Sequence, residues 1–103
     1  MRRQAMEVGA ATRQAGHRGE LTVRIRKGPL ETPGVRVLDL SLAGCMIEWH
    51  GWKLQEAQRL LVSFPTLSNV GSTVLWIEDN RVGLLFDDLL HMAVYEHMIA
   101  ARG

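Results

Sequence analysis

The chain of 103 residues contains a single cysteine and no long apolar run. One cysteine excludes an internal disulfide and fits a reducing compartment such as the cytoplasm. A membrane-spanning helix needs about 20 consecutive apolar residues, and the polar, arginine-bearing start also lacks the apolar segment of a signal peptide. We therefore expect a cytoplasmic protein without membrane insertion.

Side-chain combinations that are typical of catalysis or metal binding are also scarce. The sequence shows no glycine-rich phosphate loop, no paired catalytic carboxylates and no Ser-His-Asp arrangement. His91 and His97 are six residues apart, which places them on nearly opposite sides of a helix and not at the spacing of a zinc site. Cys45 shares a strand face with apolar neighbours, and His50 lies on the other face. We expect no enzyme, no metal site and no cofactor.

Charge is unevenly distributed, although the formal net charge is only +1. The first 36 residues include eight basic and three acidic ones, whereas the remaining 67 include four basic and eight acidic ones. A basic arm on a mildly acidic body usually meets anions, although a solvated tail is the simpler explanation. Nucleic acid is not the expected partner, because the arm has no aromatic residue and the body is acidic.

Alternating apolar side chains predict six short strands, preceded by an arm over residues 1–17 that shows no strand periodicity. The first strand begins near Leu21 and ends at Gly28-Pro29, and Thr32-Pro33-Gly34 forms a second break. The later strands are expected at residues 35–40, 45–49, 60–64, 71–77 and 82–86.

From Asp87 onward the apolar period becomes helical and predicts an α-helix over about residues 87–101. Asp87 and Asp88 suit its start, because acidic side chains there complement the helix dipole. Strands without βαβ alternation indicate a mostly β fold. We expect a six-stranded antiparallel β-barrel, or a highly curved sheet, with the C-terminal α-helix over one end.

The junction between the second and third predicted strands carries the most informative motif, Asp39-x-Ser41-x-x-Gly44. Short Asp and Ser side chains hydrogen-bond nearby backbone in turns. Glycine permits a positive φ or the close approach of another group to the backbone. The motif is therefore either an ordinary β-turn or a small polar site at a strand junction.

This motif matches the pattern (D/N)xSxxG at its three fixed positions, and through it the chain resembles the PilZ family of bacterial cyclic di-GMP receptors. The resemblance extends over residues 18–99. It rests on the order of the strands and on two further short sequence patterns, Val74-x-Trp76 and Arg81-Val82-Gly83. It implies a PilZ-like β-barrel domain over residues 18–103. Residues 1–17, which have few bulky side chains, are expected to form a flexible basic arm or a short frayed helix before it.

The family's second motif, RxxxR, is incomplete in this chain. Arg18 stands 21 residues before Asp39 and matches the second arginine, whereas Gln14 occupies the place of the first. Arg13 lies one residue further upstream and is the candidate substitute, with Arg2 and Arg3 of the arm as the alternative. Trp76 lies in a β-branched strand and is expected in the core, with a ligand contact as the alternative.

The resemblance implies a binding site for cyclic di-GMP. Guanine has two acceptors on one edge, which a planar guanidinium meets, and N–H donors on the other edge, which suit a carboxylate. The implied binding residues are Arg13, Arg18, Asp39, Ser41 and Gly44. The implied function is a receptor that relays the signal to an unidentified partner protein. The incomplete RxxxR motif leaves a second hypothesis, a degenerate domain that does not bind nucleotide and acts as a protein–protein interaction adaptor.

Overall fold

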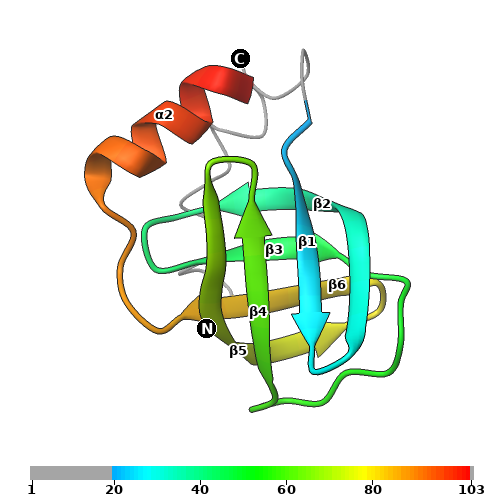
Figure 1. Ribbon diagram of the computed structural model, residues 1–103. Coiled ribbons are helices and arrows are strands. Elements are labelled where there is room, and N and C mark those ends of the chain that lie inside the picture. The colour runs from blue at the N-terminus through cyan, green and yellow to red at the C-terminus, as the bar shows by residue number, and fades with distance from the viewer. Residues whose placement is uncertain (1–19, 103) are drawn as a thin grey trace.

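The computed structural model describes residues 20–102, so Arg13, Arg18, the predicted arm and its boundary at residue 18 lie outside the described residues. Six strands and one helix follow one another along the chain: β1 (Thr22–Lys27), β2 (Leu30–Leu40), β3 (Gly44–Glu48), β4 (Arg59–Phe64), β5 (Leu67–Glu78), β6 (Arg81–Phe86) and α2 (Met92–Arg102). The strands close into a barrel in the order β1-β2-β3-β6-β5-β4, and every neighbouring pair is antiparallel (Figure 1). The predicted six-stranded antiparallel barrel with a C-terminal helix is confirmed.

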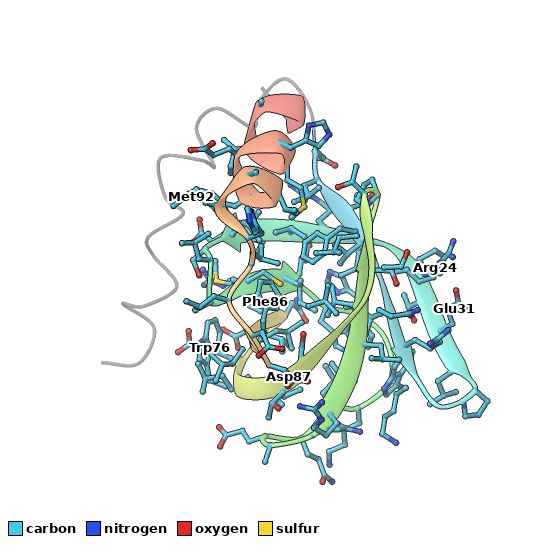
Figure 2. The ribbon with its side chains drawn as sticks, turned by 60° about the vertical axis from the view of Figure 1, so that its left-hand side comes forward. Arg24, Glu31, Trp76, Phe86, Asp87 and Met92 are labelled. Carbon is cyan, nitrogen blue, oxygen red and sulfur yellow. The ribbon has the colours of Figure 1, made fainter. Side chains whose placement is uncertain are left out.

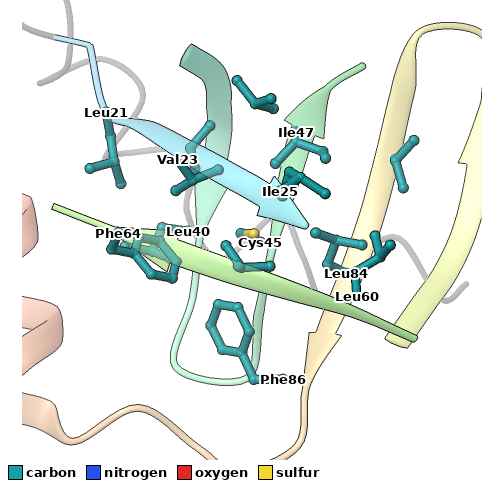
Figure 3. Packing of buried hydrophobic residues seen from close by; sticks show 14 of the residues in the cluster. Leu21, Val23, Ile25, Leu40, Cys45, Ile47, Leu60, Phe64, Leu84 and Phe86 are labelled. Carbon is teal, nitrogen blue, oxygen red and sulfur yellow. The ribbon is translucent and has the colours of Figure 1, made fainter. Parts of the chain in front are cut away.

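The barrel interior is filled by the alternating apolar side chains of the strands (Figure 3). Six of them have no exposed surface: Ile25, Leu40, Cys45, Ile47, Val62 and Leu84. Phe64 and Phe86 meet edge to face, with ring centroids 5.9 Å apart. Each fully buried aliphatic side chain contributes about 1.5–3 kcal/mol, so the interior is the main source of stability.

The chain turns between β1 and β2 only once, at Gly28-Pro29, where Gly28 has a φ of +56°. The predicted break at Thr32-Pro33-Gly34 is wrong, because β2 continues through it. Val23 pairs with Val35 and Ile25 with Thr32, so Pro33 and Gly34 form a bulge opposite one β1 residue. A bulge tolerates the missing N–H of proline, and Gly34 supplies the positive φ of +68°.

The helix begins five residues later than the predicted start at Asp87. Asp87 is instead held at the end of β6 by a two-pronged ion pair with Arg59 of β4. The last turn before the helix is organised by His91, whose carbonyl accepts a hydrogen bond from the Tyr95 amide. Its Nδ1 also accepts one from the Ala93 amide. The acidic residues therefore do not occupy the first helical turn.

Helix α2 lies over the barrel end where β1 begins and β4 ends, as predicted (Figure 1). Met98 is 3% exposed and belongs to the hydrophobic core. The core is also contacted by three partly buried helix residues, Val94, Tyr95 and Ile99. Apolar side chains at that end are thereby shielded from water. Within residues 20–102, no helix has the length and apolar character needed to cross a membrane.

Candidate functional site

Asp39 points out of the barrel because β2 contains a bulge. Val37 pairs with Ile47, but Asp39 pairs with Met46 and Leu40 with Cys45, so Leu38 is an extra residue in the ladder. Residues directly opposite each other share one face of a sheet. Simple alternation from the buried Val37 would have put Asp39 in the apolar interior, and the bulge turns its carboxylate to the outer face.

A second bulge turns Trp76 outward in the same way. Val74 pairs with Leu84 inside the barrel, whereas Trp76 pairs with Gly83, which lies on the outer face of β6. The indole rests on this glycine, since a Cβ at Gly83 would stand 2.3 Å from Trp76 Nε1. The expected place of Trp76 in the core is therefore corrected: its side chain is 7% exposed but lies outside the barrel. Figure 2 shows it on the side away from the Arg24–Glu31 pair.

Asp39, Met46, Gly83 and Trp76 form a continuous line across four strands, which we call the outer row. Asp39 pairs with Met46, Met46 with Gly83, and Gly83 with Trp76. Asp39 is 1% exposed. Hydrogen bonds and ion pairs to a carboxylate with so little water around it are stronger than in bulk solvent. The outer row thus places an acceptor carboxylate and a flat aromatic ring on one face of the sheet.

The loop between β2 and β3 is shaped by the Ser41 hydroxyl. Ser41 Oγ donates to the Gly44 carbonyl at 3.2 Å and accepts hydrogen bonds from the Ala43 and Gly44 amides. The Ser41 amide also donates to the Gly44 carbonyl at 2.9 Å. The turn-ordering interpretation of Ser41 is confirmed by these contacts, and its contact with a ligand stays a prediction.

Gly44 is required for the close approach of two strands. A Cβ at Gly44 would lie 2.0 Å from the carbonyl oxygen of Leu84 on β6. Gly44 is not among the residues with positive φ within the described part of the chain. Of the two reasons that the sequence suggested for this glycine, close approach is therefore the one that the structure supports, and the approaching group is the neighbouring strand.

The same loop is hydrogen-bonded to the segment that leads into α2. The Phe86 amide donates to the Ala43 carbonyl and the Leu90 amide donates to the Leu42 carbonyl, both at 2.8 Å. The loop that carries the motif and the approach to the helix therefore form one hydrogen-bonded unit. No sequence signal predicted this link, because it joins segments that are more than 40 residues apart.

Two further side chains are positioned as the sequence suggested. Cys45 is buried in the interior, and burial raises the pKa of its thiol to about 12, so the thiol stays protonated at neutral pH, as expected of a small apolar core residue. His50 follows the end of β3, is exposed, and its Nε2 lies 3.0 Å from Glu48 Oε2, away from the buried thiol. Among residues 20–102, no three His, Cys, Asp or Glu side chains are grouped so that they could hold a metal ion.

Of the five predicted binding residues, the structure brings together the three of the motif. Asp39 ends the outer row, and Ser41 and Gly44 build the adjoining loop. Arg13 and Arg18 lie outside the described residues, so their approach to Asp39 stays a prediction. Met46 and Gly83 were not predicted as site residues, and Trp76 was kept only as an alternative ligand contact. The cross-strand pairing that unites these three residues is not visible in local sequence.

Comparison with known families gives one match. The model of the PilZ domain family matches residues 11–100, which include the whole barrel and most of α2. No curated protein matches the chain in a sequence search.

Proposed function

Because the chain belongs to the PilZ domain family, we propose that it is a receptor that binds cyclic di-GMP and relays this signal to a partner protein. The observation that carries the proposal is the pair of bulges that turns Asp39 and Trp76 onto one outer row. Bulges commonly re-aim side chains next to functional sites.

Each member of the site has a chemical task in this proposal. The Asp39 carboxylate accepts hydrogen bonds from the N–H donors of a guanine, and Arg13 and Arg18 meet the acceptor edges and phosphates. Ser41 and Gly44 fix the loop that holds Asp39 in place. Trp76 supplies an aromatic face, and stacking of a base on such a face is worth about 1–3 kcal/mol.

Binding of this kind would change the environment of the N-terminal residues. Asp39 and Trp76 are little exposed, so a ligand that contacts them must change the surroundings of both side chains. Arginines at positions 13 and 18 would then be held against the barrel by the ligand. We expect amide exchange of residues 1–17 to slow when cyclic di-GMP is added, and equal exchange with and without ligand would contradict this mechanism.

Calorimetric titration with cyclic di-GMP tests the function itself. A hydrogen bond to a charged group is worth about 1.5–3 kcal/mol, so Arg18→Ala and Asp39→Asn are each expected to weaken binding roughly tenfold or more. Asp79→Asn is the matched control for Asp39, because Asp79 is an exposed turn residue with a positive φ that asparagine also adopts. Binding that survives both site substitutions would show that the site is elsewhere.

A second function is favoured by one observation in the sequence. Gln14 stands four residues before Arg18, where the RxxxR motif has its first arginine. A domain that has lost this arginine and no longer binds nucleotide would act as a protein–protein interaction adaptor. Absence of heat from a well-folded wild-type protein at high micromolar cyclic di-GMP would favour the adaptor over the receptor.

A further inference from the structure

Arg81 lies on the same outer face as the outer row. In β6 the side chains of Val82, Leu84 and Phe86 fill the interior, so Arg81 and Gly83 face outward. Arg81 is exposed and stands two residues from Gly83, roughly 7 Å along the strand. Its diagonal neighbour on β3 is Met46, and such a position is within reach of a long side chain.

Two acidic residues pair with Arg81 in register, Glu48 on β3 and Glu78 on β5. Within residues 20–102, neither carboxylate forms a hydrogen bond or an ion pair with the Arg81 guanidinium. Glu48 lies directly opposite Arg81, but its carboxylate meets Arg36 Nη1 at 2.9 Å and His50 Nε2 at 3.0 Å. Arg36 in turn also pairs with Glu20. Within residues 20–102, the Arg81 side chain has no hydrogen bond or ion pair. An exposed arginine beside the outer row is thus free to meet an anion.

The dimensions of the outer row suggest which part of a ligand would reach Arg81. Asp39 and Trp76 stand on strands that are three neighbours apart, roughly 14 Å, and the Trp76 indole lies over Gly83. A cyclic dinucleotide with one guanine at Asp39 and the other base against Trp76 would place its phosphodiester groups between them, above Met46. That is the position that Arg81 approaches from the side.

We propose that Arg81 binds a phosphate of the cyclic dinucleotide and supplies a positive charge that the incomplete RxxxR motif lacks. This inference rests on the proposed function and adds a residue outside both family motifs to the site. A phosphate contact depends mainly on charge, so a lysine can partly replace the arginine, whereas a two-pronged contact to a guanine edge requires the planar guanidinium.

The test is calorimetric titration of cyclic di-GMP into the wild type, Arg81→Ala, Arg81→Lys and a control, Arg26→Ala. Arg26 is an exposed arginine on β1, the strand opposite β6 in the barrel, and its guanidinium donates a hydrogen bond to Asn69 Oδ1 at 3.1 Å. We expect Arg81→Ala to weaken binding about tenfold, Arg81→Lys to weaken it less, and Arg26→Ala to leave it unchanged. The difference between wild type and Arg81→Ala should shrink at high salt.

The outcomes separate this inference from the function on which it rests. If the wild type does not bind, the receptor function and the role of Arg81 are both wrong. If the wild type binds and folded Arg81→Ala binds equally well, only the role of Arg81 is wrong. If Arg81→Lys loses as much affinity as Arg81→Ala, the contact is to a base edge and the phosphate assignment is overturned. Thermal unfolding of each variant confirms that it is folded.

Discussion

The carbonyl oxygen of Leu84 occupies the space that a side chain at Gly44 would need. A Cβ there would stand 2.0 Å from that oxygen and 3.1 Å from the carbonyl carbon. Both atoms belong to the β6 backbone at the end of the β3–β6 ladder, where Gly44 pairs with Leu85 and Cys45 with Leu84, so neither can turn away as a side chain would. Gly44 is therefore required mainly because it lets β3 pair closely with β6 and so lets the barrel close.

Gly44→Ala is expected to destabilise the fold by about 1–3 kcal/mol, because the two strands must move apart to admit the methyl group. Urea unfolding measures this loss. Gly71→Ala is the control, since the contact there is with the side chain of Asp87, which is exposed and can shift together with its ion-pair partner Arg59 more easily than backbone can. We expect Gly71→Ala to lower the free energy of unfolding less than Gly44→Ala does. The reverse order would show that β3 and β6 can separate at Gly44 more easily than the contact distances indicate.

Gly83→Ala should displace the Trp76 indole without disturbing the interior. The added methyl group would lie 2.3 Å from Trp76 Nε1, and the ring stands outside the barrel, where it can move. Nuclear magnetic resonance of the indole N–H groups reports this directly, because Trp49 and Trp52 lie in the loop between β3 and β4 and serve as internal references. We expect a large shift for Trp76 alone. An unchanged Trp76 signal would contradict the placement of the indole on Gly83.

Strand positions were predictable because they follow from the period of apolar side chains in the local sequence. Leu60, Val62 and Phe64 alternate as expected and all three are buried. The bulges were not predictable in the same way. Whether Asp39 faces inward or outward depends on which β3 residue it pairs with. That pairing is set by contacts between strands and not by the local sequence of β2.

In the candidate site, too, features set by the local sequence were predictable and features set by pairing between strands were not. The motif residues were found because their types and spacing are local properties of the sequence. Trp76 was expected in the core because a tryptophan in a β-branched strand is usually a core residue, and only the pairing with Gly83 places it outside. The late helix start has a similar cause, since Asp87 is held by a residue 28 positions earlier in the chain.

Asp87→Asn should make the protein less stable at neutral pH but not in strong acid. Hydrogen bonding from Arg59 lowers the pKa of the Asp87 carboxyl in the folded state. A lowered pKa adds stability above the ordinary value of about 3.9, and this contribution is lost as the pH falls through the folded value. The urea midpoints of wild type and Asp87→Asn are therefore expected to differ at pH 7 and to converge near pH 2.

Asp88→Asn is the matched control for this pH dependence. Asp88 is the exposed neighbour of Asp87 and forms no ion pair within residues 20–102. Its replacement should leave the urea midpoint unchanged at pH 7. A wild-type advantage over Asp87→Asn that persisted in strong acid would show that the charge of Asp87 is not what stabilises the end of β6.

Ser41→Ala tests whether the motif loop and the approach to α2 act as one unit. Removing the hydroxyl takes away hydrogen bonds to the Ala43 and Gly44 amides, at a cost of about 1 kcal/mol or more for the buried groups left without a partner. In a more mobile loop, the Ala43 and Leu42 carbonyls should bind the Phe86 and Leu90 amides less firmly. We expect faster hydrogen exchange at these two amides.

The control for this experiment is Ser63→Ala. Ser63 also accepts a backbone hydrogen bond through its hydroxyl, from the Asn69 amide at 3.0 Å, but it lies in β4 and not in the motif loop. Its loss should leave exchange at Leu90 unchanged. If Ser41→Ala also left Leu90 unchanged, the two carbonyl contacts would not couple loop and helix. If Ser41→Ala accelerates exchange at the Leu90 amide and Ser63→Ala does not, the motif loop and the segment leading into α2 are coupled. A ligand that contacts the loop could then change the orientation of α2.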